Sequence, residues 1–341
     1  MNTNKLFEQL IEGQHLTAEA MQAIMKACMQ GELQDGQIAA FLALMRMKGE
    51  TVEELTTAAQ VMMDFAHCID LGEGLIDIVG TGGDGKNTFN VSTLSSIVAA
   101  ASGAKVAKHG NRSVSSSSGS SDLLMQAGFK LTLTDEELKT CMQKQGVCFL
   151  FAPYFHKALQ NVRNARQQLG IRSFFNLLGP LVNPARVKRQ VVGVYAERLL
   201  RPIAEVLANL GSERALVIHA RDGLDELSIN AVSDVVEYAN GEFKHWTLDP
   251  ADYGLYHPSL QGILVNSPAE SLQLIEQVLA GKKGPARDIT LLNTAAALYC
   301  TDLAAGIHEG ISLAAKAIDS GIAKAHFYQL RDLTQQSGLN T

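Results

Sequence analysis

The sequence predicts an α/β fold in which a small all-helical domain, residues 1–68, precedes a larger domain, residues 72–341, with a mostly parallel central sheet flanked by helices. Three observations lead to this prediction. Residues 1 to about 68 show only helical periodicity, the chain after residue 72 alternates apolar strands with helices, and residues from about 268 to 336 are helical again. The length of 341 residues also fits two domains.

The helical domain is predicted from apolar residues spaced three and four apart. In "NKLFEQLIEG" the leucines, the phenylalanine and the isoleucine fall on one face, and "TAEAMQAIMKACMQG" and "DGQIAAFLALMRMKG" repeat the pattern and end at glycine. "TVEELTTAAQVMMDFAH" opens with Thr51 and has Glu54 three residues later, which predicts a capping box. We expect this domain to pack or dimerise rather than to carry catalytic groups.

The larger domain is predicted from strand and helix patterns that alternate. Strands are expected at "GLIDIVG", "AKVAKHG", "FKLTL", "CFLFAP", "KRQVVGVY" and "RALVIH", with helices at "STLSSIVAAASG", 122–127 and 197–210. "ELSINAVSDVVEYANGEFKHWTL" predicts two antiparallel strands that turn at Asn240 and Gly241. The alternation is typical of βαβ units in a parallel sheet.

Composition limits the classes of function. The formal charge of −6 and the pI near 5.9 argue against a general binder of nucleic acid or of anionic membranes. The five cysteines are scattered without a C-x-x-C pair, which argues against a disulfide framework or a zinc site and fits a reducing cytosol. We see no signal peptide and no apolar run long enough to span a bilayer, so a cytoplasmic protein without membrane partners is expected.

The stretch "DIVGTGGDGKNT" nearly satisfies two nucleotide-binding patterns. Gly80, Gly82 and Gly85 give G-x-G-x-x-G, but a dinucleotide site also needs an acidic residue about 20 positions on, and none lies between 84 and 122. The same stretch begins a phosphate loop, but Asn87 stands where serine or threonine would bind magnesium. The sequence therefore favours neither a nicotinamide or flavin site nor an ATPase.

The feature shared by both patterns is an anion cradle, because glycines let backbone N–H groups approach a phosphate at the start of a helix. Residues 85–121 lack any carboxylate in a chain that is acidic overall, and they carry the cationic or titratable residues Lys86, Lys105, Lys108, His109 and Arg112. The serine run "SVSSSSGSS" follows directly. A flexible linker is the alternative for that run, but its neighbours predict a site for a ligand with several phosphates.

"DGLDELS" contains the adjacent carboxylates Asp225 and Glu226. Adjacent acids are more often a solvated surface pair. Beside a phosphate site they could instead share magnesium with pyrophosphate oxygens, because Mg²⁺ prefers one or two carboxylates plus substrate phosphates.

Five blocks together carry a resemblance. "GTGGD" at 80–84, "NVST" at 90–93, "KHGNR" at 108–112, "FNLLGPLVNPA" at 175–185 and "GLDELS" at 223–228 resemble the anthranilate phosphoribosyltransferase family of tryptophan biosynthesis. The resemblance spans nearly the whole chain. It implies a fold of the nucleoside phosphorylase/phosphoribosyltransferase type, with helices from about 156–182 joining the helical domain, and a homodimer formed through that domain. The implied reaction transfers phosphoribose from phosphoribosyl pyrophosphate to the amine of anthranilate, with two Mg²⁺ ions per monomer.

The resemblance also implies site residues. Those for phosphoribosyl pyrophosphate are Gly80, Gly83, Asp84, Thr88, Asn90, Val91, Ser92, Thr93, Lys108, His109, Gly110, Asn111, Arg112, Ser113, Val114, Ser115, Ser116 and Ser120. Those for anthranilate are Gly80, His109, Asn111 and Arg166, and the implied magnesium ligands are Ser92, Asp225 and Glu226. No general acid or base is expected, because the aromatic amine needs little activation. Ser117 and Lys157 depart from the residues common in the family, lysine and proline, and we expect them to tune rather than abolish activity.

Two alternatives stay open from the residues alone. A pyrimidine-nucleoside phosphorylase would share the fold class but would need no acidic metal pair. A non-catalytic paralogue that binds nucleic acid would be expected to have lost the acceptor residues and gained positive surface, whereas this chain keeps Arg166 and the acidic pair.

Overall fold

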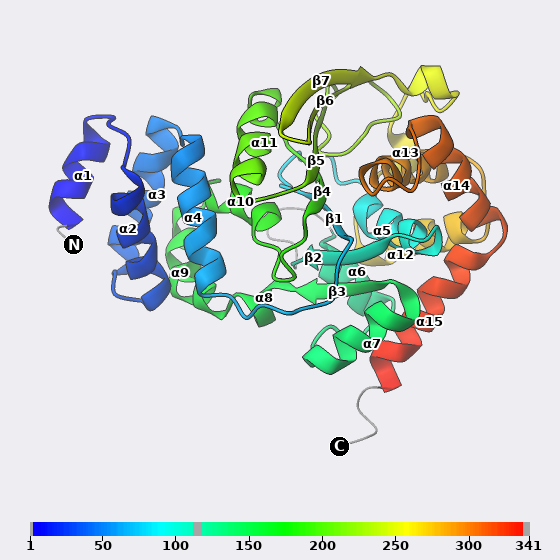
Figure 1. Ribbon diagram of the computed structural model, residues 1–341, viewed down its shortest axis with the longest axis horizontal. Coiled ribbons are helices and arrows are strands. Elements are labelled where there is room, and N and C mark those ends of the chain that lie inside the picture. Colours follow the sequence, from blue (N-terminus) through cyan, green and yellow to red (C-terminus); the bar gives the residue numbers. More distant parts are fainter. Residues whose placement is uncertain (1–2, 112–117, 337–341) are drawn as a thin grey trace.

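A computed structural model describes residues 3–111 and 118–336 (Figure 1). The helices are α1 Thr3–Ile11, α2 Ala18–Gln30, α3 Asp35–Lys48, α4 Val52–Asp64, α5 Val91–Ala101, α6 Ser120–Gln126, α7 Asp135–Gln145, α8 Ala152–Phe155, α9 Gln160–Leu169, α10 Phe175–Leu178, α11 Leu200–Asn209, α12 Pro268–Leu279, α13 Pro285–Cys300, α14 Ile307–Asp319 and α15 Ile322–Gln336. The strands are β1 Leu75–Gly80, β2 Lys105–Gly110, β3 Val147–Phe151, β4 Arg189–Gly193, β5 Arg214–Ala220, β6 Ser233–Ala239 and β7 Glu242–Leu248. Short 3₁₀ helices lie at Lys157–Leu159, Gly179–Leu181, Glu197–Leu199, Pro250–Tyr253 and Gln261–Ile263.

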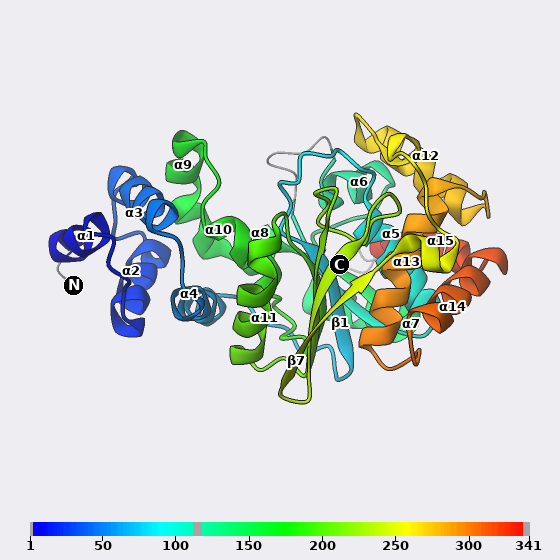
Figure 2. The same cartoon turned by 90° about the horizontal axis from the view of Figure 1, so that it is seen from above.

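Helices α1 to α4 form a bundle at one end of the molecule, and α9 packs against α2 and α3 (Figures 1 and 2). The predicted capping box begins α4: Glu54 N–H donates to Thr51 Oγ1 at 3.2 Å, and Thr51 N–H donates to Glu54 Oε2 at 2.8 Å. The Glu54 carboxylate is fully buried and also binds Lys48 Nζ at 2.7 Å. One carboxylate therefore satisfies the helix start and an interior ammonium group together.

The strands form one sheet in the order β3-β2-β1-β4-β5-β6-β7. β1 to β5 run parallel, and β6 and β7 add an antiparallel hairpin at one edge. Asn240 and Gly241 make the hairpin turn with φ of 53° and 82°, so both residues adopt the positive φ that a type I′ turn requires. The predicted α/β class and the Asn-Gly turn are confirmed.

One predicted strand is wrong. "FKLTL", residues 129–133, is irregular chain between α6 and α7. Phe129 is buried with its ring 5.3 Å from that of Phe327 on α15, and Lys130 N–H donates to Thr334 Oγ1 at 3.1 Å. Its alternating apolar residues are therefore satisfied by packing against a distant helix rather than by a neighbouring strand.

Each face of the sheet has its own apolar core. Val191 and Leu216 point to the face covered by α5 and α13, and the alternate positions Val192 and Val217 point to the face covered by α11. The second core continues from α11 into the bundle of α1 to α4 without interruption. Figure 2 shows α11 between the bundle and the sheet.

The carboxyl ends of the parallel strands form a common edge of the sheet, different from the edge that the hairpin occupies. At this edge β1 leads into the glycine loop 81–90 and then into α5. The loop after β5 carries the acidic pair to the same edge. Polar loops at the carboxyl ends of parallel strands are the usual place for a ligand site in such folds. Within the described ranges 3–111 and 118–336, no helix combines the length and apolarity needed to cross a bilayer.

Candidate active site

The acidic pair lies directly on the glycine loop. Gly82 N–H donates to Asp225 Oδ2 at 2.7 Å, across 143 residues of sequence. Gly80 and Gly193 are register partners on β1 and β4, and a Cβ on either would collide with residue 225, at 2.4 Å from Asp225 Oδ2 and 1.4 Å from Asp225 O respectively. The two glycines therefore admit the acidic loop to the end of the sheet.

Glu226 binds the start of α5. Ser92 N–H donates to Glu226 Oε1 at 3.1 Å, and Lys108 Nζ donates to Ser92 Oγ at 3.2 Å. Glu226 Oε2 is buried and has no hydrogen-bond partner among the described residues. An unpaired buried carboxylate oxygen is costly. This oxygen is therefore a position where a cation would be stabilised.

The pKa values of three carboxyl groups at this edge are raised, mainly by burial. Burial and then the charge of Asp84 raise the pKa of Asp225 to about 7. Burial and then the charges of Asp225 and Asp84 raise the pKa of Glu226 well above its ordinary value, and burial raises that of Asp84. Near neutral pH the site therefore favours either bound protons or a bound cation.

The residues fit magnesium held jointly with a substrate. Among the described residues no three His, Cys, Asp or Glu side chains form a ready metal site. Mg²⁺ is usually bound by one or two carboxylates and completes its shell with phosphate oxygens and water. The unpaired Glu226 oxygen and the neighbouring Asp225 carboxylate match that partial set.

Two lysines of the carboxylate-free tract, residues 85–121, lie at opposite ends of the sheet. Lys108 is buried at the site end, where its Nζ donates to Ile78 O. The negative charges of Asp77, Glu226 and Asp225 favour its charged form. Burial lowers its pKa. Lys105 begins the same strand and lies exposed at the opposite end, with its Nζ 3.4 Å from Glu73 O. The expectation that Lys105 serves the anion site is therefore wrong, because a strand places its first and last residues far apart.

His109 is buried and neutral. Burial lowers its pKa to about 3, so it adds no positive charge to the tract. Its Nδ1 lies 3.3 Å from Gly179 O, and its ring centroid lies 5.1 Å from that of His156. In a neutral imidazole the nitrogen facing a carbonyl carries the hydrogen. Nε2 is buried, and no residue that the structure describes bonds to it, so it is then a free acceptor.

Arg166 projects from α9 with its guanidinium carbon 5.3 Å from the centroid of the Phe175 ring. The side chain is partly buried, and burial lowers its pKa. No carboxylate pairs with it in the part of the chain that the structure describes. A guanidinium in such a place can bind a carboxylate through two parallel hydrogen bonds.

The other residues predicted to bind phosphoribosyl pyrophosphate lie around the glycine loop and the start of α5. Thr88 forms a β-bridge to Leu264, and Val91 N–H donates to Phe89 O at 2.7 Å. Thr93 has a buried hydroxyl with no partner within the described ranges. Asn111 O accepts from Ser120 Oγ at 3.2 Å, and a Cβ on Gly110 would lie 2.5 Å from Ser120 Oγ. The predicted ligands Arg112, Ser113, Val114, Ser115 and Ser116, and the departure at Ser117, lie outside the described residues.

Several residues that shape the site were not predicted. Asp77, fully buried, accepts from His109 N–H at 3.2 Å and from Asn183 Nδ2 at 2.7 Å. Arg172 donates from Nη1 to Gly83 O at 2.6 Å and lies 4.6 Å over the Tyr195 ring. An aspartate inside the apolar strand "LIDIVG" was a signal that the sequence offered for Asp77.

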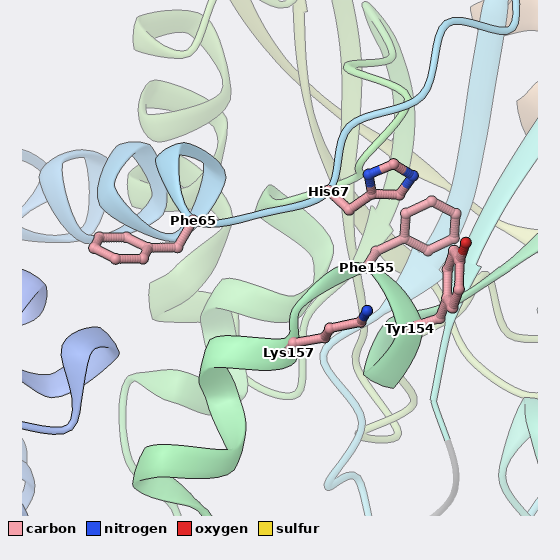
Figure 3. Close-up of a pocket in the computed structure, with 5 residues that line it drawn as sticks. All are labelled: Phe65, His67, Tyr154, Phe155 and Lys157. Atoms are coloured by element: carbon pink, nitrogen blue, oxygen red, sulfur yellow. The ribbon is translucent and has the colours of Figure 1, made fainter.

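A separate cavity of about 240 Å³ lies where the bundle joins the sheet, lined by Phe65, His67, Tyr154, Phe155 and Lys157 (Figure 3). Lys157 Nζ lies 5.6 Å from the Tyr154 ring centroid, and His67 Nε2 binds Asp135 at 2.9 Å. The departure at Lys157 therefore lies at this cavity, whose lining does not include Asp225 or Glu226.

Comparisons with known proteins identify both parts of the chain. Residues 4–66 match the helical bundle domain of a glycosyl transferase family, and residues 72–324 match the a/b domain of that family. The chain is 62% identical over 335 residues to anthranilate phosphoribosyltransferase of Legionella pneumophila (strain Paris), covering 98% of this chain and 97% of that one. It is 46% identical over 337 residues to the enzyme of the same name from Hydrogenovibrio crunogenus, covering 98% and 99%.

Solved structures show the same fold. Anthranilate phosphoribosyltransferase from Thermus thermophilus superposes with a TM-score of 0.90 at 37% identity, covering 98% of this chain and 100% of that chain. The enzyme from Saccharomyces cerevisiae in complex with PRPP and Mg superposes with a TM-score of 0.89 at 27% identity, covering 98% of each chain. The same yeast enzyme in complex with 4-fluoroanthranilate has a TM-score of 0.86 at 27% identity, covering 97% of each.

Proposed function

This chain belongs to the anthranilate phosphoribosyltransferase family, and from that premise we propose how its own residues perform the reaction. The enzyme transfers the 5-phosphoribosyl group from phosphoribosyl pyrophosphate to the amine of anthranilate and releases pyrophosphate, in tryptophan biosynthesis. It uses Mg²⁺. The relatives share this name over nearly the full chain, so the nucleoside phosphorylase and nucleic-acid-binding alternatives are set aside.

The donor site, which binds the sugar donor phosphoribosyl pyrophosphate, is assigned to the glycine loop, the start of α5 and the end of β2. The observation that carries this proposal is the closure of the acidic pair onto the glycine loop, through Gly82 N–H and Asp225. Backbone N–H groups of a glycine loop and of a helix start stabilise phosphate oxygens. As the bond at C1 of the sugar breaks, these donors stabilise the negative charge that develops on the departing pyrophosphate.

Ser92, Asp225 and Glu226 are the proposed magnesium ligands. Asp225 binds the glycine loop and Glu226 binds the start of α5, so the two carboxylates face different parts of the site, which suits two ions per chain. Bound magnesium would neutralise charge on the pyrophosphate oxygens. Titration with Mn²⁺ followed by electron paramagnetic resonance would count the ions, and one ion per chain at saturation with substrate would contradict the proposed number.

The acceptor site is assigned to Arg166, His109, Asn111 and Gly80. The unpaired guanidinium of Arg166 suits the carboxylate of anthranilate. The free Nε2 of His109 can accept a hydrogen bond from the amine, and with its low pKa it orients that amine rather than removes a proton. Holding both substrates in one site supplies proximity.

Assembly, domain division and location are proposed from surface and core features. Ile11 and Met47 of the helical bundle are 63% and 83% exposed, which supports a homodimer formed through this domain. Packing of α9 against α2 and α3 supports a helical domain of residues 1–68 joined by helices from 156–182, with 72–341 as the α/β domain. The five cysteines are all free thiols, which supports a cytoplasmic location.

A fluorescence assay tests the activity. Purified protein mixed with anthranilate, phosphoribosyl pyrophosphate and Mg²⁺ is expected to consume the fluorescence of anthranilate, and removal of Mg²⁺ with a chelator should stop the reaction. Cleavage of uridine by phosphate, with anthranilate left unchanged, would contradict the proposal.

A further inference from the structure

Asn90 occupies the N-cap position of α5 but does not cap the helix. Asparagine is among the preferred N-cap residues because its side-chain oxygen accepts from the second or third N–H of the helix. In α5 those N–H groups belong to Ser92 and Thr93, and the side chain of Asn90 makes no such bond. Asn90 is therefore a typical N-cap residue whose side chain bonds to groups outside its own helix.

Two serines hold the Asn90 amide away from its own helix. Asn90 Oδ1 accepts from Ser118 Oγ and from Ser271 Oγ, both at 2.8 Å. Asn90 Nδ2 donates to Ser118 O at 3.0 Å. Both acceptor positions of the side-chain oxygen are thus filled by hydroxyl groups, and no acceptor position remains for the helix.

Ser271 also fixes the backbone of Asn90. Its hydroxyl accepts from Asn90 N–H at 3.1 Å, so one side chain binds both the main chain and the amide of a residue 181 positions earlier. Ser271 is fully buried on α12, a helix that Ser267 caps by accepting from Glu270 N–H at 3.2 Å. This hydroxyl is shielded from solvent, and its hydrogen bonds within the described part of the chain go to Asn90.

The helix start that Asn90 leaves open already binds an anionic group, since Ser92 N–H donates to the Glu226 carboxylate. A side-chain cap from Asn90 would compete for the same first-turn N–H groups. Val91 N–H already donates to Phe89 O and Ser92 N–H to Glu226, so diverting the amide keeps the N–H group of Thr93 available for an anionic ligand.

We propose that Ser271 is a positioning residue for the phosphoribosyl pyrophosphate site: with Ser118, it holds the Asn90 side chain off α5, so that the N–H group of Thr93 remains available to phosphoribosyl pyrophosphate. This inference rests on the proposed placement of the donor. Ser271 does not touch substrate and is not a catalytic residue.

The test is steady-state kinetics of Ser271→Ala. Loss of a neutral hydrogen-bonding group costs about 0.5–1.5 kcal/mol, which corresponds to a rise of about 2–10-fold in the KM for phosphoribosyl pyrophosphate. The KM for anthranilate and kcat should stay within about twofold, because α12 packs mainly against α6, α13 and α15, whereas Arg166 lies on α9, which packs against α2 and α3. Equal rises in both KM values, or no change in either, would overturn the proposal.

Ser95→Ala is the matched control, because Ser95 is a fully buried serine on α5 whose hydroxyl has no partner in the part of the chain that the structure describes. It should leave both KM values unchanged. A double-mutant cycle with Asn90→Ala then asks whether Ser271 acts through Asn90: the effect of Ser271→Ala should shrink in the Asn90→Ala background. Fully additive effects would refute the mechanism.

Ser271→Cys covers the case in which the alanine variant folds poorly, because cysteine is close in size and a weaker hydrogen-bond donor. It should raise the same KM in the same direction. Product formation by the wild-type enzyme is read in the same assay, so a failure of this inference is separate from a failure of the proposed function.

Discussion

Gly193 and Asp225 approach so closely that a Cβ on the glycine would lie 1.4 Å from the carbonyl oxygen of Asp225. The contact joins the end of β4 to the acidic loop that follows β5. Gly193 has no positive φ, so the restriction is steric and does not come from the backbone conformation. The position of the acidic pair therefore depends on a glycine that is not among the proposed ligand-binding residues.

Gly193→Ala is expected to displace the acidic loop and lower kcat/KM. A shift of about 1 Å in a catalytic group costs about 100-fold. Gly36→Ala is the control, because a Cβ on Gly36 meets nothing within 4 Å and its φ is not positive. If Gly193→Ala keeps wild-type kcat/KM and magnesium dependence, the steric argument is wrong.

Replacing Asp225 and Glu226 together by alanine should nearly abolish turnover and its dependence on magnesium, by at least about 100-fold in kcat. The measurement is kcat across a magnesium titration, with the exposed Asp252→Asn as the control. Turnover that still rises with magnesium would contradict the assignment of the ligands.

The raised pKa of Asp225 predicts how the stability of the metal-free protein depends on pH. The pKa of Asp225 is raised from 3.8 to about 7, so the folded state holds a proton that the unfolded state releases. Its contribution to stability is therefore greatest below pH 4 and is lost as pH rises toward 7. Asp225→Asn should unfold at a higher urea concentration than the wild type at pH 8 without magnesium, and the difference should vanish near pH 4. A less stable variant at pH 8 would contradict this.

Arg166→Ala should raise the KM for anthranilate by about 10–150-fold, the loss expected for a hydrogen bond to a charged group worth about 1.5–3 kcal/mol. The KM for phosphoribosyl pyrophosphate should change little. Arg163→Ala, an exposed arginine on the same helix, controls for lost charge. Equal effects on both substrates would remove Arg166 from the acceptor site.

His109 should make the fold sensitive to acid. Its pKa falls from 6.5 to about 3 on folding, so its contribution to stability is complete above pH 6.5 and is lost as pH falls toward 3. The loss is about 1.4 kcal/mol per pH unit within that window. Urea unfolding at pH 7.5 and 5 should show a smaller decrease for His109→Gln than for the wild type, and the exposed His308→Gln should match the wild type. Identical decreases in all three would exclude a buried neutral imidazole.

Local features of the fold were predictable because short stretches determine them. The capping box at Thr51 and the turn at Asn240 and Gly241 follow from the chemistry of two or three residues. The stretch "FKLTL" was not, because its alternating pattern also suits packing against α15, which lies about 200 residues further on by the Lys130–Thr334 bond.

The candidate site likewise has features that could be predicted from the sequence and features that could not. That the acidic pair would lie near the glycine loop followed from the charge pattern and the resemblance, and the structure places them in contact. The neutral state of His109 and the divided tract, with Lys105 at the far end of β2, depend on burial and strand direction that residue type does not reveal. The bond from Ser271 to Asn90 joins segments 181 residues apart, and no local pattern in the sequence indicates it.

The apolar core that passes from α11 into the N-terminal bundle limits how this protein can be engineered. Expressing the α/β part without α1 to α4 would leave the apolar face of α11 that packs against α4 open to water, so such a truncation should aggregate. A chimera that exchanges bundles between relatives should therefore transplant α9, α10 and α11 together with the first four helices.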